Sequence, residues 1–436
     1  MTPHSASADQ LDQLVDTENG LVATAIFQDE AIYQQELERI FARCWLYLGH
    51  DSELEKEGDY IAAKMGDDPI VVVRARDGRI RAFLNSCRHR GPKLCRADKG
   101  NTGALRCPYH GWTYALSGEL LGVPRLKTAY HDELDKRQFG LVEVAQLDTY
   151  QGMIFATWDP DASSLREYLG DFTVYLDMMM NRAEGGVEVI GGVHKWTIET
   201  NWKIPAENFC GDQYHLSTTH GSSVEVGLRN RVGDAGHTLK VDGGHSLIRE
   251  KGGATQGTAA LSDYTRYVEE TRERIARERG PEAAEFVPIG VGTIFPNLSF
   301  LDSVRFRTLR IFHPVGPRRI EINSWCLVDK ELSPELKEAA MRQYVLVFGP
   351  SGMFEQDDGE IWNSISEATR GHIGRQRVFN YQMGLGHEVP VSEVYGVDMP
   401  GTMGEAFITE SNHRGFYREW ARRMSAEPPA LAPVEG

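Results

Sequence analysis

The feature that most constrains this chain is a pattern of two cysteines and two histidines between residues 87 and 110. Cys87 and His89 form the first pair, and Cys107 and His110 form the second, in the spacing C-x-H, seventeen residues, C-x-x-H. Glycine and proline flank both pairs, which is typical of tight turns that present side chains from loop tips. The four side chains therefore predict a single metal site.

Two thiolates and two imidazoles suit either a structural zinc or a two-iron, two-sulfur cluster with cysteine on one iron and histidine on the other. Zinc modules usually place Cys with Cys and His with His, two to five residues apart. Here each pair contains one Cys and one His, so each pair can serve both irons. The spacing favours a Rieske cluster, and zinc is the alternative.

Composition limits the class of protein and its partners. The 436 residues are 41% hydrophobic and 25% charged, as in an ordinary globular protein of two or three domains. The net charge of -16 argues against nucleic acid or an anionic membrane as a partner. We see neither a signal peptide nor a membrane-spanning run, and the other four cysteines show no pairing framework. We therefore expect a cytoplasmic protein with reduced thiols.

A second group of metal-ligating residues lies between Asn201 and His220. If this stretch is helical, Asn208, Asp212 and His215 fall at i, i+4 and i+7 on one face. His220 would be rotated away in a regular helix, so it requires a helix end or a π-bulge. A lone buried histidine is usually a core residue, but two histidines beside a carboxylate favour a metal site.

The missing ligand is expected from the acidic stretch that contains Asp357 and Asp358. The sequence alone does not separate these neighbours, and an acidic helix start is the alternative interpretation. Two histidines and one carboxylate form the facial triad of non-haem iron(II) oxygenases, which leaves coordination positions open for dioxygen. The pattern therefore predicts a mononuclear iron site that activates oxygen.

The rest of the chain shows a mixture of helix and strand patterns. A helix is expected to begin after Asp29, and Asp77-Gly78 predicts a type I′ hairpin turn between two strands. Residues 262–279 predict a charged, solvated helix, and Ser333-Pro334 predicts the start of another. Patterning alone indicates an α+β protein.

The motifs Cys-Arg-His-Arg-Gly and Cys-Pro-Tyr-His-Gly-Trp resemble the Rieske domain of bacterial aromatic-ring-hydroxylating oxygenase large (alpha) subunits, and the resemblance extends over nearly the whole chain. The overall pattern is most similar to the biphenyl, toluene and naphthalene dioxygenase group. It implies an N-terminal helical segment (1–41) packing on the catalytic domain, a small all-β Rieske [2Fe-2S] domain (42–160), and a larger helix-grip domain with an antiparallel sheet (161–436).

The resemblance also implies roles for individual residues. Asp358 would bind the mononuclear iron with His215 and His220, and Asn208 would lie near it. Asp212 would hold His215 and contact His110 of a neighbouring subunit, so that electrons cross between subunits.

As a member of this family, the chain would be the terminal oxygenase of a dioxygenase that converts an aromatic ring to a cis-dihydrodiol with O2. Electrons would come from NAD(P)H through a separate ferredoxin or flavin reductase, because the chain shows no G-x-G-x-x-G unit after a strand and no plant-type ferredoxin pattern. A small beta subunit would complete an alpha3beta3 assembly, with an alpha3 homotrimer as the alternative.

Candidate substrate-pocket residues lie close to the ligands and are mostly apolar, which favours a flat neutral arene. They are Phe209, Gln213, Leu216, Phe348, Met353 and Phe354. A buried arginine would instead indicate an aromatic carboxylate, and Arg229, Arg231, Arg305 and Arg307 are not placed by the sequence. The alternatives in function are a Rieske monooxygenase or demethylase acting on an aromatic acid, a Rieske electron carrier, and a zinc-stabilised interaction protein.

Overall fold

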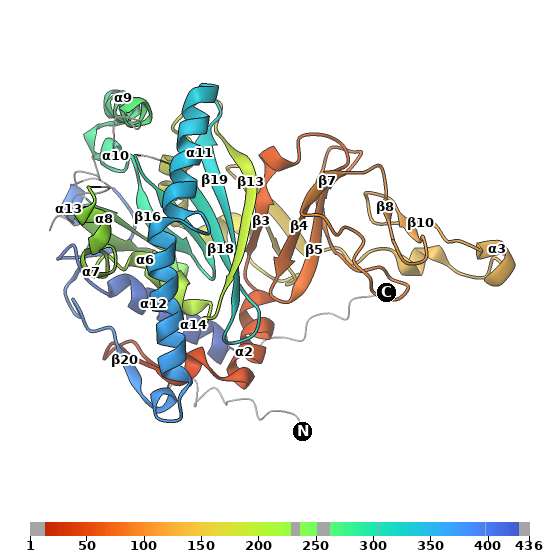
Figure 1. Cartoon of the computed structure of the whole chain (residues 1–436), viewed down its shortest axis with the longest axis horizontal. Coiled ribbons are helices and arrows are strands. Elements are labelled where there is room, and N and C mark those ends of the chain that lie inside the picture. The colour runs from red at the N-terminus through yellow and green to blue at the C-terminus, as the bar shows by residue number, and fades with distance from the viewer. Residues whose placement is uncertain (1–13, 228–235, 251–261, 305, 397, 427–436) are drawn as a thin grey trace. The chain divides into compact units, whose positions relative to one another are not determined.

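The computed structural model describes residues 14–227, 236–250, 262–304, 306–396 and 398–426. Within these ranges the chain forms two compact units, one of residues 41–165 and one of residues 14–40 together with 166–426 (Figure 1). The strands described in both units pair antiparallel. The predicted α+β class is confirmed, with a small unit dominated by β-structure and a larger unit built on an antiparallel sheet.

The smaller unit is built from three short sheets, with strand orders β6-β5-β4-β7, β11-β12-β3 and β10-β9-β8. Its strands are β3 (Leu46–His50), β4 (Asp59–Met65), β5 (Asp68–Arg74), β6 (Ile80–Leu84), β7 (Lys99–Asn101), β8 (Leu105–Arg106), β9 (Thr113–Tyr114), β10 (Leu120–Gly122), β11 (Gln146–Tyr150) and β12 (Met153–Thr157). The short helical segments are η3 (Asp51–Glu53), α3 (Leu126–Ala129) and η4 (Lys136–Phe139). The sheets place the two Cys-His pairs on the loops after β6 and β8.

The hairpin between β5 and β6 forms where the Asp-Gly pair predicts it, with Val72 opposite Ala82. The turn differs from the predicted type I′. Gly78 has a φ of 81°, whereas Asp77 is not among the residues with positive φ. The amide of Gly78 donates to Ala75, so a four-residue turn ends at a left-handed glycine. Only one residue needs positive φ in this turn, and glycine supplies it.

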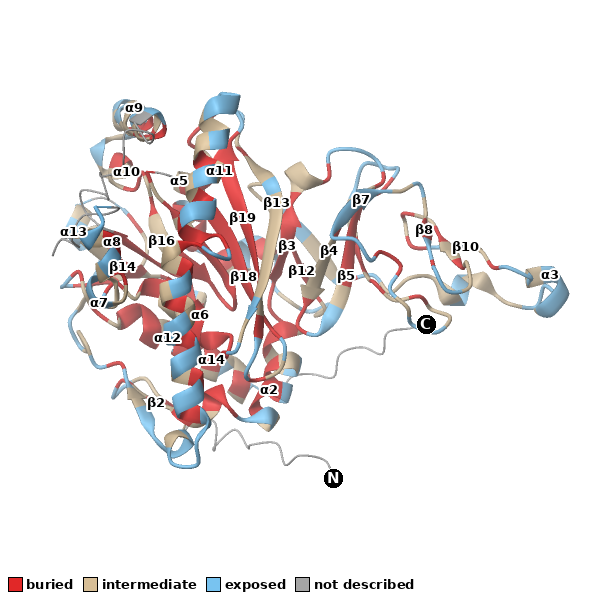
Figure 2. Ribbon diagram, viewed as in Figure 1, coloured by how far each residue is buried: buried red, intermediate tan, exposed pale blue. Residues whose placement is uncertain are grey.

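The larger unit is organised around a nine-stranded sheet in the order β13-β19-β18-β17-β16-β15-β14-β22-β21. The strands are β13 (Val187–Ile198), β14 (Gly236–Lys240), β15 (Ser246–Glu250), β16 (Gly290–Ile294), β17 (Leu298–Asp302), β18 (Arg307–Pro314), β19 (Ile320–Asp329), β21 (Glu388–Pro390) and β22 (Thr402–Gly404). A separate small sheet joins β1 (Val15–Asp16), β2 (Leu21–Ala23) and β20 (Val378–Asn380). The long strands β18 and β19 are buried along nearly their whole length (Figure 2).

Helices cover both faces of the large sheet. On one face α6 receives a hydrogen bond from the sheet, since the Thr293 hydroxyl donates to the Ala206 carbonyl. On the other face Phe172 of α5 contacts Phe300 of β17. The helical segments of this unit are η1 (Thr24–Phe27), α2 (Glu30–Glu36), η2 (Leu37–Phe41), α4 (Leu165–Leu169), α5 (Phe172–Met180), α6 (Lys203–Gly211), α7 (Leu216–Thr219), α8 (Gly221–Glu225), η5 (Asp242–Gly244), α9 (Ser262–Arg279), α10 (Pro281–Glu285), α11 (Pro334–Phe348), α12 (Met353–Arg370), η7 (Gly374–Gln376), α13 (Val391–Tyr395) and α14 (Ser411–Ser425).

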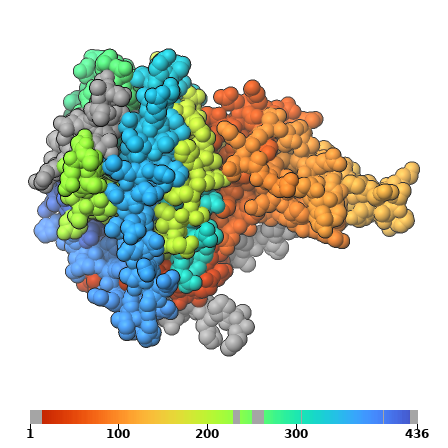
Figure 3. Space-filling view, viewed as in Figure 1, coloured from red at the N-terminus to blue at the C-terminus, as the bar shows by residue number. Residues whose placement is uncertain are grey.

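Helix starts that the sequence predicts are present. The Asp29 side chain accepts hydrogen bonds from the first amides of α2, and Ser333 caps α11 in the same way. The helices α11 and α12 contact each other, and Figure 3 shows them forming an outer layer beside β13. Among the described residues, no helix is long and apolar enough to cross a membrane.

Helix α9 spans the predicted residues but is not fully solvated. Tyr264, Val268 and Ile275 are buried on one side, and the Tyr267 hydroxyl donates to Asp329 at 2.9 Å. The helix carries many charged residues on its other side, so its composition does not indicate this narrow apolar face.

Candidate active site

The segment that carries the two candidate iron-binding histidines is a broken helix. Helix α6 ends at Gly211, and Asp212 has φ and ψ of -82° and 81°, which do not continue the helix. A single regular helix through His215 is therefore wrong. His215 precedes α7, and His220 lies at the junction between α7 and α8, a helix end of the kind that its spacing requires.

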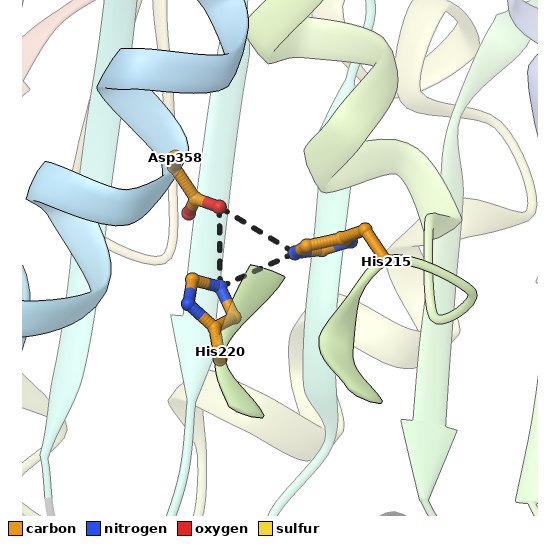
Figure 4. A group of neighbouring side chains, drawn as sticks. All are labelled: His215, His220 and Asp358. Carbon is orange, nitrogen blue, oxygen red and sulfur yellow. Dashed lines mark hydrogen bonds and ion pairs between the residues drawn. The ribbon is translucent and has the colours of Figure 1, made fainter. Parts of the chain in front are cut away.

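This break brings three side chains together at one point (Figure 4). The Nε2 atoms of His215 and His220 are 3.3 Å apart, and the Oδ1 atom of Asp358 is 3.5 Å and 3.1 Å from them, respectively. Adjacent ligands of an octahedral ion with bonds of about 2.1 Å are about 3.0 Å apart. The three donor atoms thus have the chemistry and nearly the spacing of a facial set around one iron.

The other nitrogen of each histidine has its own acceptor. The Nδ1 atom of His215 lies 2.5 Å from the carbonyl of Asp212 and 3.4 Å from the carboxylate of the same residue. The Nδ1 atom of His220 lies 3.2 Å from Asp357. The acidic neighbours Asp357 and Asp358 therefore contact opposite sides of His220. Asn208 lies 3.4 Å from Nδ1 of His215.

The electrostatics of this group favour a bound cation. Burial alone would lower the pKa of His215, but hydrogen bonds to Asp212 and Asp358 outweigh it and raise that pKa to about 10. Burial would raise the pKa of Asp358, yet the two histidines lower it. Positive charge is thus stabilised between these groups.

The four residues of the Cys-His pattern also meet, in the smaller unit. The Nδ1 atoms of His89 and His110 are 3.1 Å apart, and both rings are partly exposed. Cys87 and Cys107 are buried in the core of the unit. Histidines on the outer side and cysteines on the inner side fit a two-iron cluster with one type of ligand on each iron.

A buried tyrosine lies beside one of these cysteines. The Tyr114 hydroxyl oxygen accepts from the amide of Arg88 at 3.0 Å and lies 3.4 Å from Sγ of Cys87. A cysteine that binds a cluster is a thiolate and carries no hydrogen, so the Tyr114 hydroxyl would be the donor in this contact.

Comparison with known proteins agrees with both sites. Residues 44–150 match the Rieske [2Fe-2S] domain, and residues 187–426 match the catalytic domain of the ring hydroxylating alpha subunit. The alpha subunit of biphenyl 2,3-dioxygenase from Rhodococcus jostii is 40% identical, with 97% of this chain and 93% of that protein covered. The chain belongs to the family of aromatic-ring-hydroxylating dioxygenase alpha subunits.

Other members of the family are similarly close. The alpha subunit of benzene 1,2-dioxygenase from Pseudomonas putida is 39% identical, with 96% of this chain and 94% of that protein covered. The crystal structure of naphthalene 1,2-dioxygenase from Rhodococcus sp. bound to indole has a TM-score of 0.86 at 37% identity, with 97% and 99% coverage. Membership of this dioxygenase family implies a Rieske cluster and a mononuclear iron, which the two donor sets fit.

In this alpha subunit the histidines and Asp358 lie in the wall of a cavity of about 180 Å³. Five of the six predicted pocket residues line it: Phe209, Gln213, Leu216, Phe348 and Phe354. Met353 is not among the lining residues, although it begins the same helix as Phe354. Closeness to a ligand in the sequence was not sufficient for Met353 to line the cavity.

Sequence reasoning missed the cavity-wall residues that come from strands β15 to β17, from the connection between β17 and β18, and from Val347 of α11. These residues are mostly apolar: Ile248, Val291, Leu301, Val304, Phe306 and Val347. The alternation of apolar residues in strands predicts that one face is buried, but it does not say which strands meet the iron site.

Proposed function

We propose that this chain is the terminal oxygenase of a multicomponent system that adds both atoms of O2 to adjacent carbons of a neutral aromatic ring, giving a cis-dihydrodiol. The observation that carries the proposal is the convergence of His215, His220 and Asp358 in the wall of a mainly apolar cavity. Such cavities bind small apolar ligands and orient them with a few polar groups.

In this proposal His215, His220 and Asp358 hold iron(II), which when bound supplies the activation of O2. The protein fixes the two imidazoles. The acceptors at Asp212 and Asp357 hold a proton on each Nδ1 atom, which leaves both Nε2 atoms as donors toward the metal. Asn208 lies at the edge of this group, and its amide nitrogen is 3.5 Å from the Asp212 carboxylate.

Dihydroxylation consumes two electrons and two protons, so the oxygenase requires an external reductant. We propose that Cys87, His89, Cys107 and His110 hold the cluster that receives these electrons. The side chains of Asp212 and His110 are both partly exposed, which supports contact between Asp212 and His110 of a neighbouring subunit. Electrons would then cross from one subunit to the next.

The electrostatics of the cavity support a neutral substrate. Arg249 is the only lysine or arginine among the described lining residues. Adjacent strand residues point to opposite faces, and Ile248 is on the face covered by α6. The Arg249 guanidinium lies on the other face, over the Phe286 ring and 4.0 Å from Glu285. Among the described residues that line the cavity, no lysine or arginine therefore directs its charge at the iron site.

Of the four arginines that the sequence left open, the structure describes Arg307. Arg307 is buried and pairs with Asp329, on the sheet face opposite to the cavity. Arg229, Arg231 and Arg305 lie outside the described residues.

We propose a small beta subunit, a ferredoxin and a flavin reductase as partners, with NAD(P)H as the electron source, in the cytoplasm. The support is that the relatives are named as alpha subunits or, in one case, as the large oxygenase component of a system, which implies further components. An alpha3beta3 assembly is our first expectation, and an alpha3 homotrimer is the alternative.

A single-turnover experiment tests the proposal. Chemically reduced holoprotein would be mixed with isotopically labelled O2 and a panel of neutral arenes and aromatic acids, and the products analysed by mass spectrometry. We expect a cis-diol with two labelled atoms from neutral arenes. One labelled atom, or loss of a methyl group, would instead indicate a monooxygenase or demethylase. Reduction without any product, unchanged by His215→Ala, would indicate an electron carrier.

A further inference from the structure

Arg310 is a fully buried arginine on the sheet face that carries the cavity. In β18 it lies between Ser299 of β17 and Ser324 of β19, whose short side chains leave room for it. The same face is covered by α6 and by the ends of α11 and α12. Its guanidinium is therefore enclosed behind the cavity wall.

Two aromatic residues of the cavity enclose this guanidinium. Its central carbon is 4.7 Å from the ring centroid of Phe209 and 4.8 Å from that of Phe348. Both rings line the cavity, and their centroids are 6.2 Å apart. A planar cation stacks on aromatic faces, and a desolvated position strengthens this attraction. The orientation of each ring is thus coupled to the position of Arg310.

Arg310 is also tied to the helix that carries the candidate iron-binding carboxylate. Its Nη1 atom donates to Glu355 at 2.7 Å, and Glu355 also accepts from the Trp196 indole at 3.2 Å. Glu355 and Asp358 are three residues apart on α12, so they lie on the same side of that helix. The ion pair therefore anchors the first turn of α12, directly before Asp358.

The same rings extend to a histidine of the iron site. Phe348 contacts Phe354 with ring centroids 5.6 Å apart, and Phe354 stacks on His220 at 4.4 Å. Arg310 thus reaches the iron site by two routes, through Glu355 to Asp358 and through Phe348 and Phe354 to His220.

Stability alone does not explain a guanidinium at this place. A buried ion pair is generally no more stabilising than a well-packed apolar pair of the same volume. A planar cation between two pocket rings, however, fixes their separation and tilt in a way that flexible apolar side chains do not.

We propose that Arg310 is a positioning residue that determines which edge of the bound arene faces the iron site. It acts by holding Phe209 and Phe348 around its guanidinium and by anchoring Glu355 before Asp358. The inference rests on the proposed function, since it concerns the orientation of the aromatic substrate of that site.

The test compares Arg310→Lys with a matched control, Arg307→Lys. Lysine retains the positive charge and can reach the carboxylate, but it lacks the planar guanidinium. Arg307 is a buried, ion-paired arginine on the same strand whose side chain is on the opposite face. The iron content and the cluster spectrum of each holoprotein would be checked first. Two ratios would then be measured. One is the ratio of the dissociation constants of 1- and 2-methylnaphthalene, and the other is the ratio of the regioisomeric cis-diols formed from each isomer.

We expect Arg310→Lys to change at least one of these ratios about fivefold or more, while Arg307→Lys stays within about twofold of wild type. Equal ratios for Arg310→Lys and wild type, or an equal change in both variants, would overturn the inference. If Arg310→Lys does not fold, Arg310→Met combined with Glu355→Met removes both charges together and is measured in the same way.

The outcomes for the two proposals are distinguishable. If wild-type protein binds the isomers but forms no diol, the proposed function fails, and the ratio of dissociation constants still decides the role of Arg310. If wild-type protein binds neither isomer, the inference is overturned.

Discussion

A buried ion pair between Glu36 and Lys203 joins three distant parts of the larger unit. Both side chains are fully buried, and Nζ of Lys203 lies 2.5 Å from Oε1 of Glu36. The Glu36 carboxylate also accepts from the indoles of Trp202 and Trp420, each at 2.8 Å. Lys203 begins α6, the helix that carries Asn208. The pair therefore connects the N-terminal helix and α14 to the helix that leads into the iron site.

We expect Lys203→Met to lower the free energy of unfolding of this unit by about 3–5 kcal/mol, because it leaves the Glu36 carboxylate buried without a cation. The double variant Lys203→Met with Glu36→Gln should lose only about 1–2 kcal/mol. The glutamine removes the unpaired charge, and its amide oxygen still accepts a hydrogen bond from one indole. Two changes should thus be less destabilising than one.

The assay is thermal unfolding followed by circular dichroism. A loss of 1 kcal/mol corresponds to about 2–4 °C in Tm for units of this size, so Lys203→Met should lower Tm by about 6 °C or more. The control is Lys337→Met, which breaks the partly exposed pair with Glu188 and should change the free energy by less than about 1 kcal/mol. A double variant as unstable as Lys203→Met, or less stable, would refute the reasoning.

Three further predictions concern metal content, redox potential and pH. Asp358→Ala should abolish the binding of mononuclear iron while the cluster spectrum is retained. Asp357→Ala should weaken iron binding only about 10–100-fold, as measured by metal analysis. The reverse result would exchange the roles of the two aspartates. Tyr114→Phe should lower the reduction potential of the cluster by about 40–60 mV, because the hydrogen bond from Tyr114 to Cys87 favours the more negative reduced state. An unchanged midpoint in a redox titration would contradict this. Burial lowers the pKa of His245 to about 4, so the unfolded chain binds a proton at this residue at a higher pH than the folded protein does. The folded protein should therefore lose up to about 3 kcal/mol of stability as the pH falls from 6.5 to 4. Denaturant titrations should show a smaller loss in His245→Gln.

Local patterns in the sequence predicted those structural features that depend only on residues close to one another in the chain. The hairpin at Asp77-Gly78 and the helix start at Ser333 depend on residues within one turn of each other. The residues of each predicted metal-ligand pattern also lie close together in the structure, and such patterns can be found in a sequence because ligand chemistry restricts them to Cys, His and carboxylates.

Contacts between distant segments were not predicted. Glu36 lies in an amphipathic helix pattern where a charge is expected at the surface, yet its partner is Lys203, far along the chain. Arg310 reads as an ordinary residue of a strand, and its contacts with Phe209 and Glu355 depend on how helices cross the sheet. The end of α6 at Gly211 was missed as well, because the i, i+4, i+7 spacing of polar residues is compatible with an unbroken helix.

The broken helix also has a consequence for how the protein matures. His215 and His220 are neighbours in sequence, but Asp358 joins them from α12, which follows strands β14 to β19 in the chain. Iron bound by all three side chains therefore stabilises the assembled fold over any partly folded chain. At a free iron concentration one hundred times the dissociation constant, this linkage contributes about 2.7 kcal/mol. Iron supply during synthesis would then influence the yield of folded protein as well as its activity.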